Sequence, residues 1–186
     1  MGSDSQIDLE GFRLWAVGNL VENRNRGIFA EWLVGSALGV VNPEEPRLEW
    51  DVADLRYRGH LIEVKSSGRG QTWVQEKPST IRFDVAPLKE PWDAATNIWR
   101  KLDPPERLAF LYVFCCHEPF PATNSDVANP ETWKFWVIPT SLLDTELGDQ
   151  KTIGEGRLNS LVSPIRWGRL KPTIDSLIRT VSKGGQ

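Results

Sequence analysis

The chain has 186 residues, of which 40% are hydrophobic and 25% are charged, and its formal net charge is −3. This composition is ordinary for a globular protein, and the chain is long enough to bury a hydrophobic core without the help of disulfides or structural metals. We therefore expect residues 1–186 to form a single domain. A negative net charge is not typical of nucleic-acid-binding proteins, although an enzyme whose carboxylates hold cations can be acidic overall.

Membrane, secretory and disulfide classes find no support in the sequence. No apolar run approaches the length of a membrane span, and Asp4, Asp8 and Glu10 stand where a signal peptide would be basic and apolar. We therefore expect a cytoplasmic protein without membrane association. The only cysteines, Cys115 and Cys116, are adjacent, lack metal-ligand spacing and are expected to be buried thiols.

Two helices are expected at the N-terminal end of the chain. The spacing of apolar residues predicts one over 7–22 and another over 27–38, separated by a turn at 23–27. Glu31 is the only charged residue of the second helix. Such a carboxylate either marks the solvent side of the helix or needs a partner inside the protein.

A β-hairpin is predicted next, with Arg58-Gly59 as its turn, because apolar residues typical of strands lie on both sides. A two-residue loop would place Asp54 opposite Glu63, with Lys65 on the same face as Glu63. The Cβ atoms of such a pair lie about 5 Å apart, so the carboxylates repel each other unless a cation lies between them. The hairpin therefore predicts a divalent-metal site. A one-residue bulge would put Asp51 in the place of Asp54, and that alternative remains open.

Later segments complete an α/β pattern. They predict, in chain order, a strand at 81–85 with one polar face, a short helix within 92–101, a strand at 108–116 buried on both faces, a polar loop at 119–130, a strand at 132–138, a helix from Thr140 or Ser141 to Leu147, and a final helix at about 171–182. This order predicts a central mixed sheet of about five strands flanked by helices.

Asp54 together with Glu63-Val64-Lys65 resembles the motif of the PD-(D/E)xK nuclease superfamily, whose members share the restriction endonuclease-like fold. In that family an aspartate and the E-x-K of the next strand hold one or two Mg²⁺ ions, and the lysine orients or activates the attacking water. The resemblance covers about residues 24–85. It departs at Ala53, where the family's motif has proline.

The resemblance implies a metal site of Asp54, Glu63 and Val64 that binds Mg²⁺, with Mn²⁺ as a substitute. Lys65 and the helical Glu31 would complete the catalytic set. Carboxylate-held Mg²⁺ suits phosphodiester hydrolysis, because it supplies a nucleophilic hydroxide near neutral pH and stabilises charge on the phosphoryl oxygens.

Substrate contacts are expected just after the motif. Many members of the family carry a polar residue after the lysine, and Ser66, Gln71 and Gln75 fit that habit, although both glutamines could equally be surface amides. Arg69 belongs to a local basic cluster and is a candidate phosphate contact.

The favoured interpretation is a metal-dependent DNA endonuclease in a restriction, defence or repair setting. Two alternatives stay open. The chain could be a non-catalytic nuclease-fold scaffold that binds nucleic acid or a partner protein, or the nuclease subunit of a larger complex. A homodimer would suit the cutting of both DNA strands.

Overall fold

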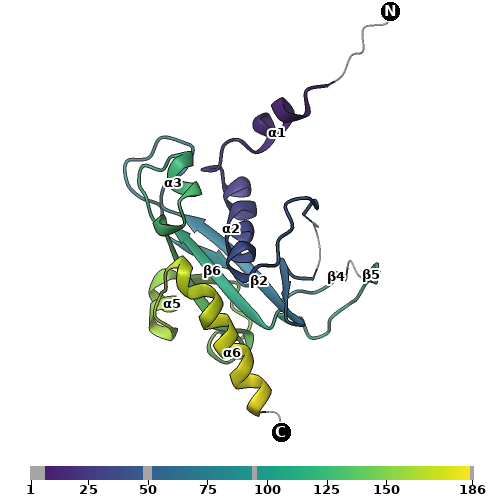
Figure 1. Cartoon of the computed structure of the whole chain (residues 1–186). Helices are drawn as coiled ribbons and strands as arrows, with labels where there is room; N and C mark the ends of the chain where they lie inside the picture. The colour runs from purple at the N-terminus through teal and green to yellow at the C-terminus, as the bar shows by residue number, and fades with distance from the viewer. Residues whose placement is uncertain (1–6, 48–51, 94–95, 185–186) are drawn as a thin grey trace, which may run out of the picture.

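The computed structural model describes residues 7–47, 52–93 and 96–184, and its centre is a mixed four-stranded sheet (Figure 1). The strands lie in the order β1 (Leu55–Tyr57), β2 (His60–Gly68), β6 (Leu111–His117) and β7 (Trp133–Pro139). β1 is antiparallel to β2, β2 is parallel to β6, and β6 is antiparallel to β7. The expected α/β class, with a mixed sheet flanked by helices, is confirmed.

The central sheet has four strands rather than about five, because the strand expected at 81–85 lies elsewhere. It forms β3 (Arg82–Asp84), with the predicted alternation of exposed and buried residues, and pairs with β8 (Thr152–Gly154) in a separate sheet. The buried Phe83 packs against Phe114 of β6, with 5.2 Å between ring centroids. β3 therefore lies over a face of the central sheet instead of extending its edge.

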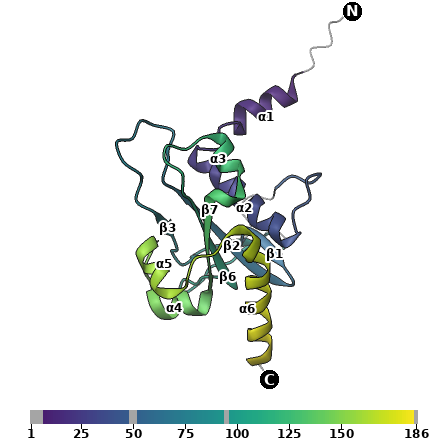
Figure 2. The ribbon, with the colours of Figure 1, turned by 60° about the vertical axis from the view of Figure 1, so that its left-hand side comes forward.

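Helices cover one face of the sheet, and a mixed layer covers the other (Figure 2). On the first face, α2 (Asn23–Leu38) and α6 (Leu170–Gly184) bury the side chains of Ile62 and Val64. The opposite face packs against β3, β8, α4 (Thr140–Leu147) and α5 (Glu155–Leu161). Since side chains alternate along a strand, neighbours on β2 serve different layers.

β6 is the most deeply buried strand of the sheet. All seven of its residues are buried, as its continuous apolar run predicted. Cys115 and Cys116 are free and buried within it, which confirms their expected state. β2 pairs with β6 from Ile62 to Gly68. The hairpin is therefore held in place by a strand that lies outside residues 24–85, the range covered by the family resemblance.

The N-terminal helices differ from the expected bounds. α1 (Leu9–Val17) is shorter than the predicted 7–22, has no buried residue, and points away from the sheet (Figure 1). α2 begins at Asn23 rather than at residue 27, because the Glu22 side chain accepts the Asn25 N–H and caps the helix. The segment expected as a turn is thus the first turn of α2.

The helix predicted within 92–101 is wrong. The structure has two short paired strands there, β4 (Trp92–Asp93) and β5 (Ile98–Trp99). Asn97 has a φ of 56°, a left-handed conformation that bends the chain before β5. The positions that suggested a helix instead alternate between the two faces of a hairpin.

Short helices complete the described chain. These are α3 (Asn124–Ala128), inside the loop expected at 119–130, and the 3₁₀ turns η1 (Pro130–Thr132) and η2 (Trp167–Arg169). Across residues 7–47, 52–93 and 96–184, no helix combines the length and apolar character that crossing a bilayer requires.

Candidate active site at the β1–β2 hairpin

The hairpin has the predicted register and turn. Leu55 pairs with Ile62 and Tyr57 pairs with His60, so Arg58 and Gly59 form the two-residue loop. Both loop residues have positive φ, 50° and 80°, as a type I′ hairpin turn requires. Continuing this register by one residue places Asp54 opposite Glu63.

Asp54 is fixed to the backbone of β2. Its Oδ2 accepts a hydrogen bond from the Val64 N–H at 2.7 Å. In an extended strand the N–H and C=O of one residue point to the same edge. The Val64 carbonyl oxygen therefore faces the edge where Asp54 lies, beyond the end of the β1 ladder.

Glu63 and Lys65 lie on the sheet face opposite α2. Their partners on β6 are Tyr112 and Phe114, which belong to the core beneath β3. Lys65 Nζ lies 2.5 Å from Glu63 Oε1, and the two side chains are 31% and 18% exposed. The pair is thus accessible from solvent but largely surrounded by protein.

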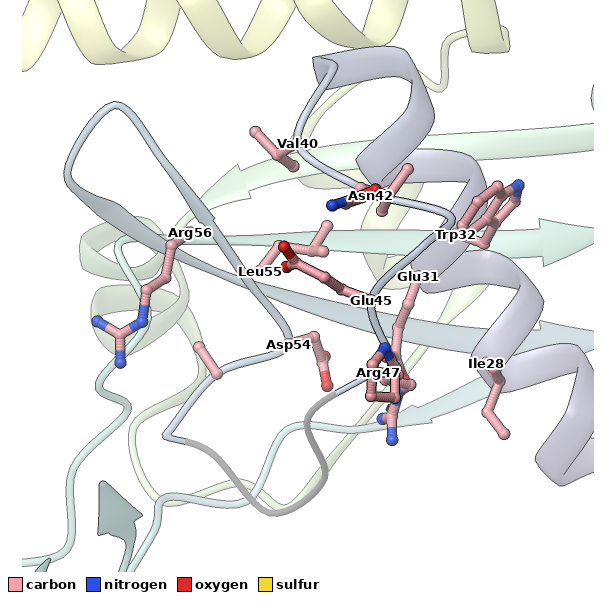
Figure 3. Close-up of a pocket in the computed structure, with 13 residues that line it drawn as sticks. Ile28, Glu31, Trp32, Val40, Asn42, Glu45, Arg47, Asp54, Leu55 and Arg56 are labelled. Carbon is pink, nitrogen blue, oxygen red and sulfur yellow. Dashed lines mark hydrogen bonds and ion pairs between the residues drawn. The ribbon is translucent and has the colours of Figure 1, made fainter. Parts of the chain in front are cut away.

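Glu31 reaches the site from α2 and is held by Arg47. The Arg47 Nη2 donates to Glu31 Oε1 at 2.7 Å, and Arg47 Nε donates to Oε2. Figure 3 shows this pair beside Asp54, on the wall of a cavity of about 320 Å³. A second cavity, of about 340 Å³, is lined by Glu63, Lys65 and Tyr112.

Burial raises the pKa of all three carboxylates above their ordinary values. For Glu63, the negative charges of Asp54 and Glu31 raise the pKa further, while Lys65 opposes the shift. For Asp54, burial outweighs the Val64 N–H and the cations Lys65 and Arg47, which lower the pKa. For Glu31, burial is joined by the charge of Asp54 and opposed by Arg47. The three acids therefore act on one another electrostatically.

The pKa of Lys65 is raised, although burial alone would lower it. The ion pair and hydrogen bond with Glu63 outweigh burial, and the charges of Asp54 and Asp84 add to the shift. Asp84 comes from β3, above the same face of the sheet. Lys65 is therefore held as a cation within a field of carboxylates.

The donor chemistry of these residues fits Mg²⁺. Carboxylates and a main-chain carbonyl are oxygen ligands that this ion prefers. The raised pKa values of the three acids indicate that their negative charges are not fully neutralised by neighbouring cations. In the part of the chain that the structure describes, no three His, Cys, Asp or Glu side chains are gathered closely enough to hold a metal as they stand. Glu31 is turned toward Arg47, and Glu63 toward Lys65. Binding by the set would thus replace existing ion pairs.

The expected substrate-contacting residues are not gathered with the acids. Ser66 pairs with Cys115 and so lies on the α2 face, opposite Lys65. Arg69 donates to Glu155 of α5 at 2.7 Å. Gln71 and Gln75 hold their own loop, because the Gln75 Oε1 accepts the Gln71 N–H and both amides contact Ser79.

Two neighbours of the site were not anticipated from the sequence. Arg47 lies in a loop without a recognisable pattern, so nothing in the sequence indicated its pairing with Glu31. Asp84 lies on the polar face of a predicted strand, which was a usable signal. Asp51, the alternative to Asp54, lies outside the described residues.

A comparison of the chain with protein-family models, with curated proteins and with solved structures finds no match in any of the three.

Proposed function

We propose that this protein is a Mg²⁺-dependent deoxyribonuclease of the PD-(D/E)xK type with a restriction endonuclease-like fold, acting as an endonuclease in restriction, defence or repair. The observation that carries the proposal is the hairpin register, which sets Asp54 beside Glu63 and Lys65. The raised pKa values of Asp54 and Glu63 support it, since partly buried carboxylates this close together attract a cation.

In this function, Asp54, Glu63 and the Val64 carbonyl hold the ion, and Glu31 assists from α2. Bound Mg²⁺ lowers the pKa of a water molecule and offsets charge on the phosphoryl oxygens. Lys65 keeps a positive charge at the same face, where it orients the attacking water and stabilises the negative charge that develops on the phosphate. The partly buried setting strengthens both effects.

The test is a calorimetric titration of Mn²⁺ and Mg²⁺ into the wild type and Glu63→Gln, followed by the same samples on supercoiled plasmid. Glu155→Gln is a matched control, because Glu155 is a similarly exposed acid in ion pairs with Arg69 and Lys134. We expect metal binding and metal-dependent nicking in the wild type and in Glu155→Gln, and neither in Glu63→Gln.

Equal metal binding by all three proteins, with intact plasmid throughout, would reject the nuclease. That result would favour a nuclease-fold scaffold. Metal binding that depends on Glu63, without nicking of plasmid, would instead direct the search to a partner subunit or another nucleic-acid substrate.

A further inference from the structure

A two-stranded extension, which we call the arm (residues 88–93 and 96–106), rises from the region of the candidate site. Its ladder begins at the bridge between Leu88 and Glu106 and ends at the pair Asp93 and Ile98, next to the pair Trp92 and Trp99. Between these points the Leu102 N–H donates to the Lys89 carbonyl at 2.7 Å. Figure 1 shows β4 and β5 projecting beyond the edge of the central sheet.

The base of the arm forms part of the cavity that Glu63 and Lys65 line. Leu88 and Lys89 line this cavity together with Glu63 and Lys65. The base of the arm therefore borders the same space as Glu63 and Lys65.

The arm also lies beside β1 farther along its length. Arg56 Nη2 of β1 lies 3.9 Å from Asp93 Oδ1 of β4. This ion pair holds the arm next to the strand that follows Asp54.

The outer part of the arm exposes an aromatic and apolar surface. Trp99 is 68% exposed and Ile98 is 59% exposed. Trp92 and Trp99 are directly opposite in the ladder, so their side chains share a face. Trp92 is half-buried and its indole N–H donates to Asn97, so Trp99 is the tryptophan of this pair that offers an exposed ring face on the projecting hairpin.

Two cations adjoin this surface. Arg100 and Lys101 are exposed, and neither forms an ion pair with another residue that the structure describes. Alternation along the strand places Lys101 on the face of Trp99 and Arg100 on the other face. The acidic residues Asp103 and Glu106 lie farther toward the base. Glu90 and Asp93 lie on the opposite strand of the arm, and Asp93 forms the ion pair with Arg56. The end of the arm thus places an exposed tryptophan beside two cations that adjoin it along its own strand.

We propose that the arm binds single-stranded DNA, with a base stacked on Trp99 and the neighbouring phosphates contacted by Arg100 and Lys101. Only an unpaired base presents its whole face for stacking on an aromatic side chain. The proposal rests on the proposed nuclease function, which it deepens by making unpaired nucleotides the preferred substrate. The arm then leads the strand toward Glu63 and Lys65.

The test is fluorescence anisotropy of a labelled oligothymidine of 20 nucleotides, in buffer with EDTA so that cleavage cannot interfere. Trp99→Ala is compared with Trp73→Ala, a control because Trp73 is 59% exposed but lies in the loop after β2, outside the arm. We expect Trp99→Ala to weaken binding about 5- to 150-fold and Trp73→Ala to change it less than about twofold. A duplex should bind more weakly than the single strand and be insensitive to Trp99→Ala.

A second variant tests the cations. Replacing Arg100 and Lys101 together by alanine should reduce the slope of log affinity against log salt by about 1.4, as two lost contacts to a single strand predict. Equal losses in the two tryptophan variants, equal affinity for the duplex, or an effect of Trp99→Ala on protein self-association alone would overturn the proposal.

The nuclease assignment is judged separately from the arm. If the wild type nicks plasmid but the arm variants bind the oligonucleotide normally, the nuclease proposal stands and the proposed role of the arm is rejected. Oligonucleotide binding that depends on Trp99, in a protein that cleaves no DNA, would do the reverse.

Discussion

Two clusters of charged side chains are joined by β2, the candidate site midway along the strand and an ion-pair network beyond its end, and their charge balance is opposite. The ion-pair network consists of Arg69, Glu118, Lys134, Glu155 and Arg166. The carboxylate oxygens of Glu155 lie 2.7 Å from Arg69 Nη2 and 3.4 Å from Lys134 Nζ. Those of Glu118 lie 2.8 Å from Lys134 Nζ and 2.6 Å from Arg166 Nη1. Three cations thus neutralise two carboxylates.

The candidate site has the reverse proportion. Glu31, Asp54 and Glu63 share Lys65 and Arg47. Burial raises the pKa of all three acids, and the charges of neighbouring carboxylates raise the pKa of Glu31 and Glu63 further. In the ion-pair network, Lys134 and Arg166 outweigh burial and lower the pKa of Glu118. The comparison teaches that two clusters of charged groups in one fold can differ in net charge, and that the proposed metal site is the cluster with an excess of partly buried negative charge.

The largest expected difference between the clusters is in catalysis. If the proposed function holds, Lys65→Ala should lower the rate of plasmid nicking at least about 100-fold, because the cation assigned to the developing phosphate charge is lost. Lys134→Ala, which removes a partly buried lysine of the ion-pair network, should leave the rate within about twofold. Circular dichroism of both variants checks the fold, and equal rates in the two would contradict the assignment of Lys65.

Metal binding should stabilise the protein only through the candidate site. At a Mn²⁺ concentration 100 times the dissociation constant, the free energy of unfolding should rise by about 2.7 kcal/mol. The rise should vanish in Asp54→Asn and persist in Glu118→Gln. Urea unfolding with and without the metal measures it, and a rise that survives in Asp54→Asn would place the ion elsewhere.

The two clusters should respond oppositely to pH in metal-free buffer. Asp54 and Glu63 keep protons in the folded state at pH values where the unfolded chain has lost them, so their contribution to stability falls as pH rises from about 4 through their raised pKa values. Glu118 has a lowered pKa, so its contribution is present above about pH 4.5 and is lost as pH falls.

Urea unfolding from pH 3 to pH 8 separates these contributions. Glu63→Gln should flatten the decline above pH 4 and so gain stability relative to the wild type near neutral pH. Glu118→Gln should lose stability at neutral pH and little at pH 3. The same pH profile in both variants would mean that the two clusters do not differ in the way described.

A smaller effect is expected from Arg47, which competes for Glu31. Arg47→Ala should tighten Mn²⁺ binding about two- to fivefold, the equivalent of a partly exposed ion pair of about 0.5–1 kcal/mol. Arg13→Ala, which removes the exposed ion pair with Glu10 on α1, is the control and should leave the affinity unchanged. Weaker Mn²⁺ binding in Arg47→Ala would show that Arg47 supports the site instead of blocking it.

Features set by neighbouring residues were predictable from the sequence, whereas features set by distant packing were not. The hairpin register followed from a two-residue turn, and the burial of β6 followed from its apolar run. The segment 92–101 was misassigned because its apolar spacing suits a short helix and a hairpin alike, and Asn97 decides between them. The pairing of Glu31 with Arg47 joins residues 16 positions apart through a patternless loop.

Gln71 and Gln75 also show why a side chain's partners could not be predicted from the sequence. A glutamine in an extended segment can contact a substrate or satisfy nearby backbone groups, and sequence alone does not distinguish these roles. Here Gln71 donates to the Gly68 carbonyl at 2.8 Å and Gln75 donates to Arg69. The loop consumes the hydrogen-bonding capacity that a phosphate contact would have needed.

The attachment of the hairpin to α6 bears on how the protein matures during synthesis. The Tyr57 hydroxyl donates to Asp175 at 2.8 Å, across 118 residues of chain, and accepts from Lys171. A ribosome therefore releases Asp54, Glu63 and Lys65 long before it makes the helix that fastens their hairpin or the strand that supports β2. A nascent chain carries the acids without their arrangement, and the hydrolytic activity proposed here begins only when the fold is nearly complete.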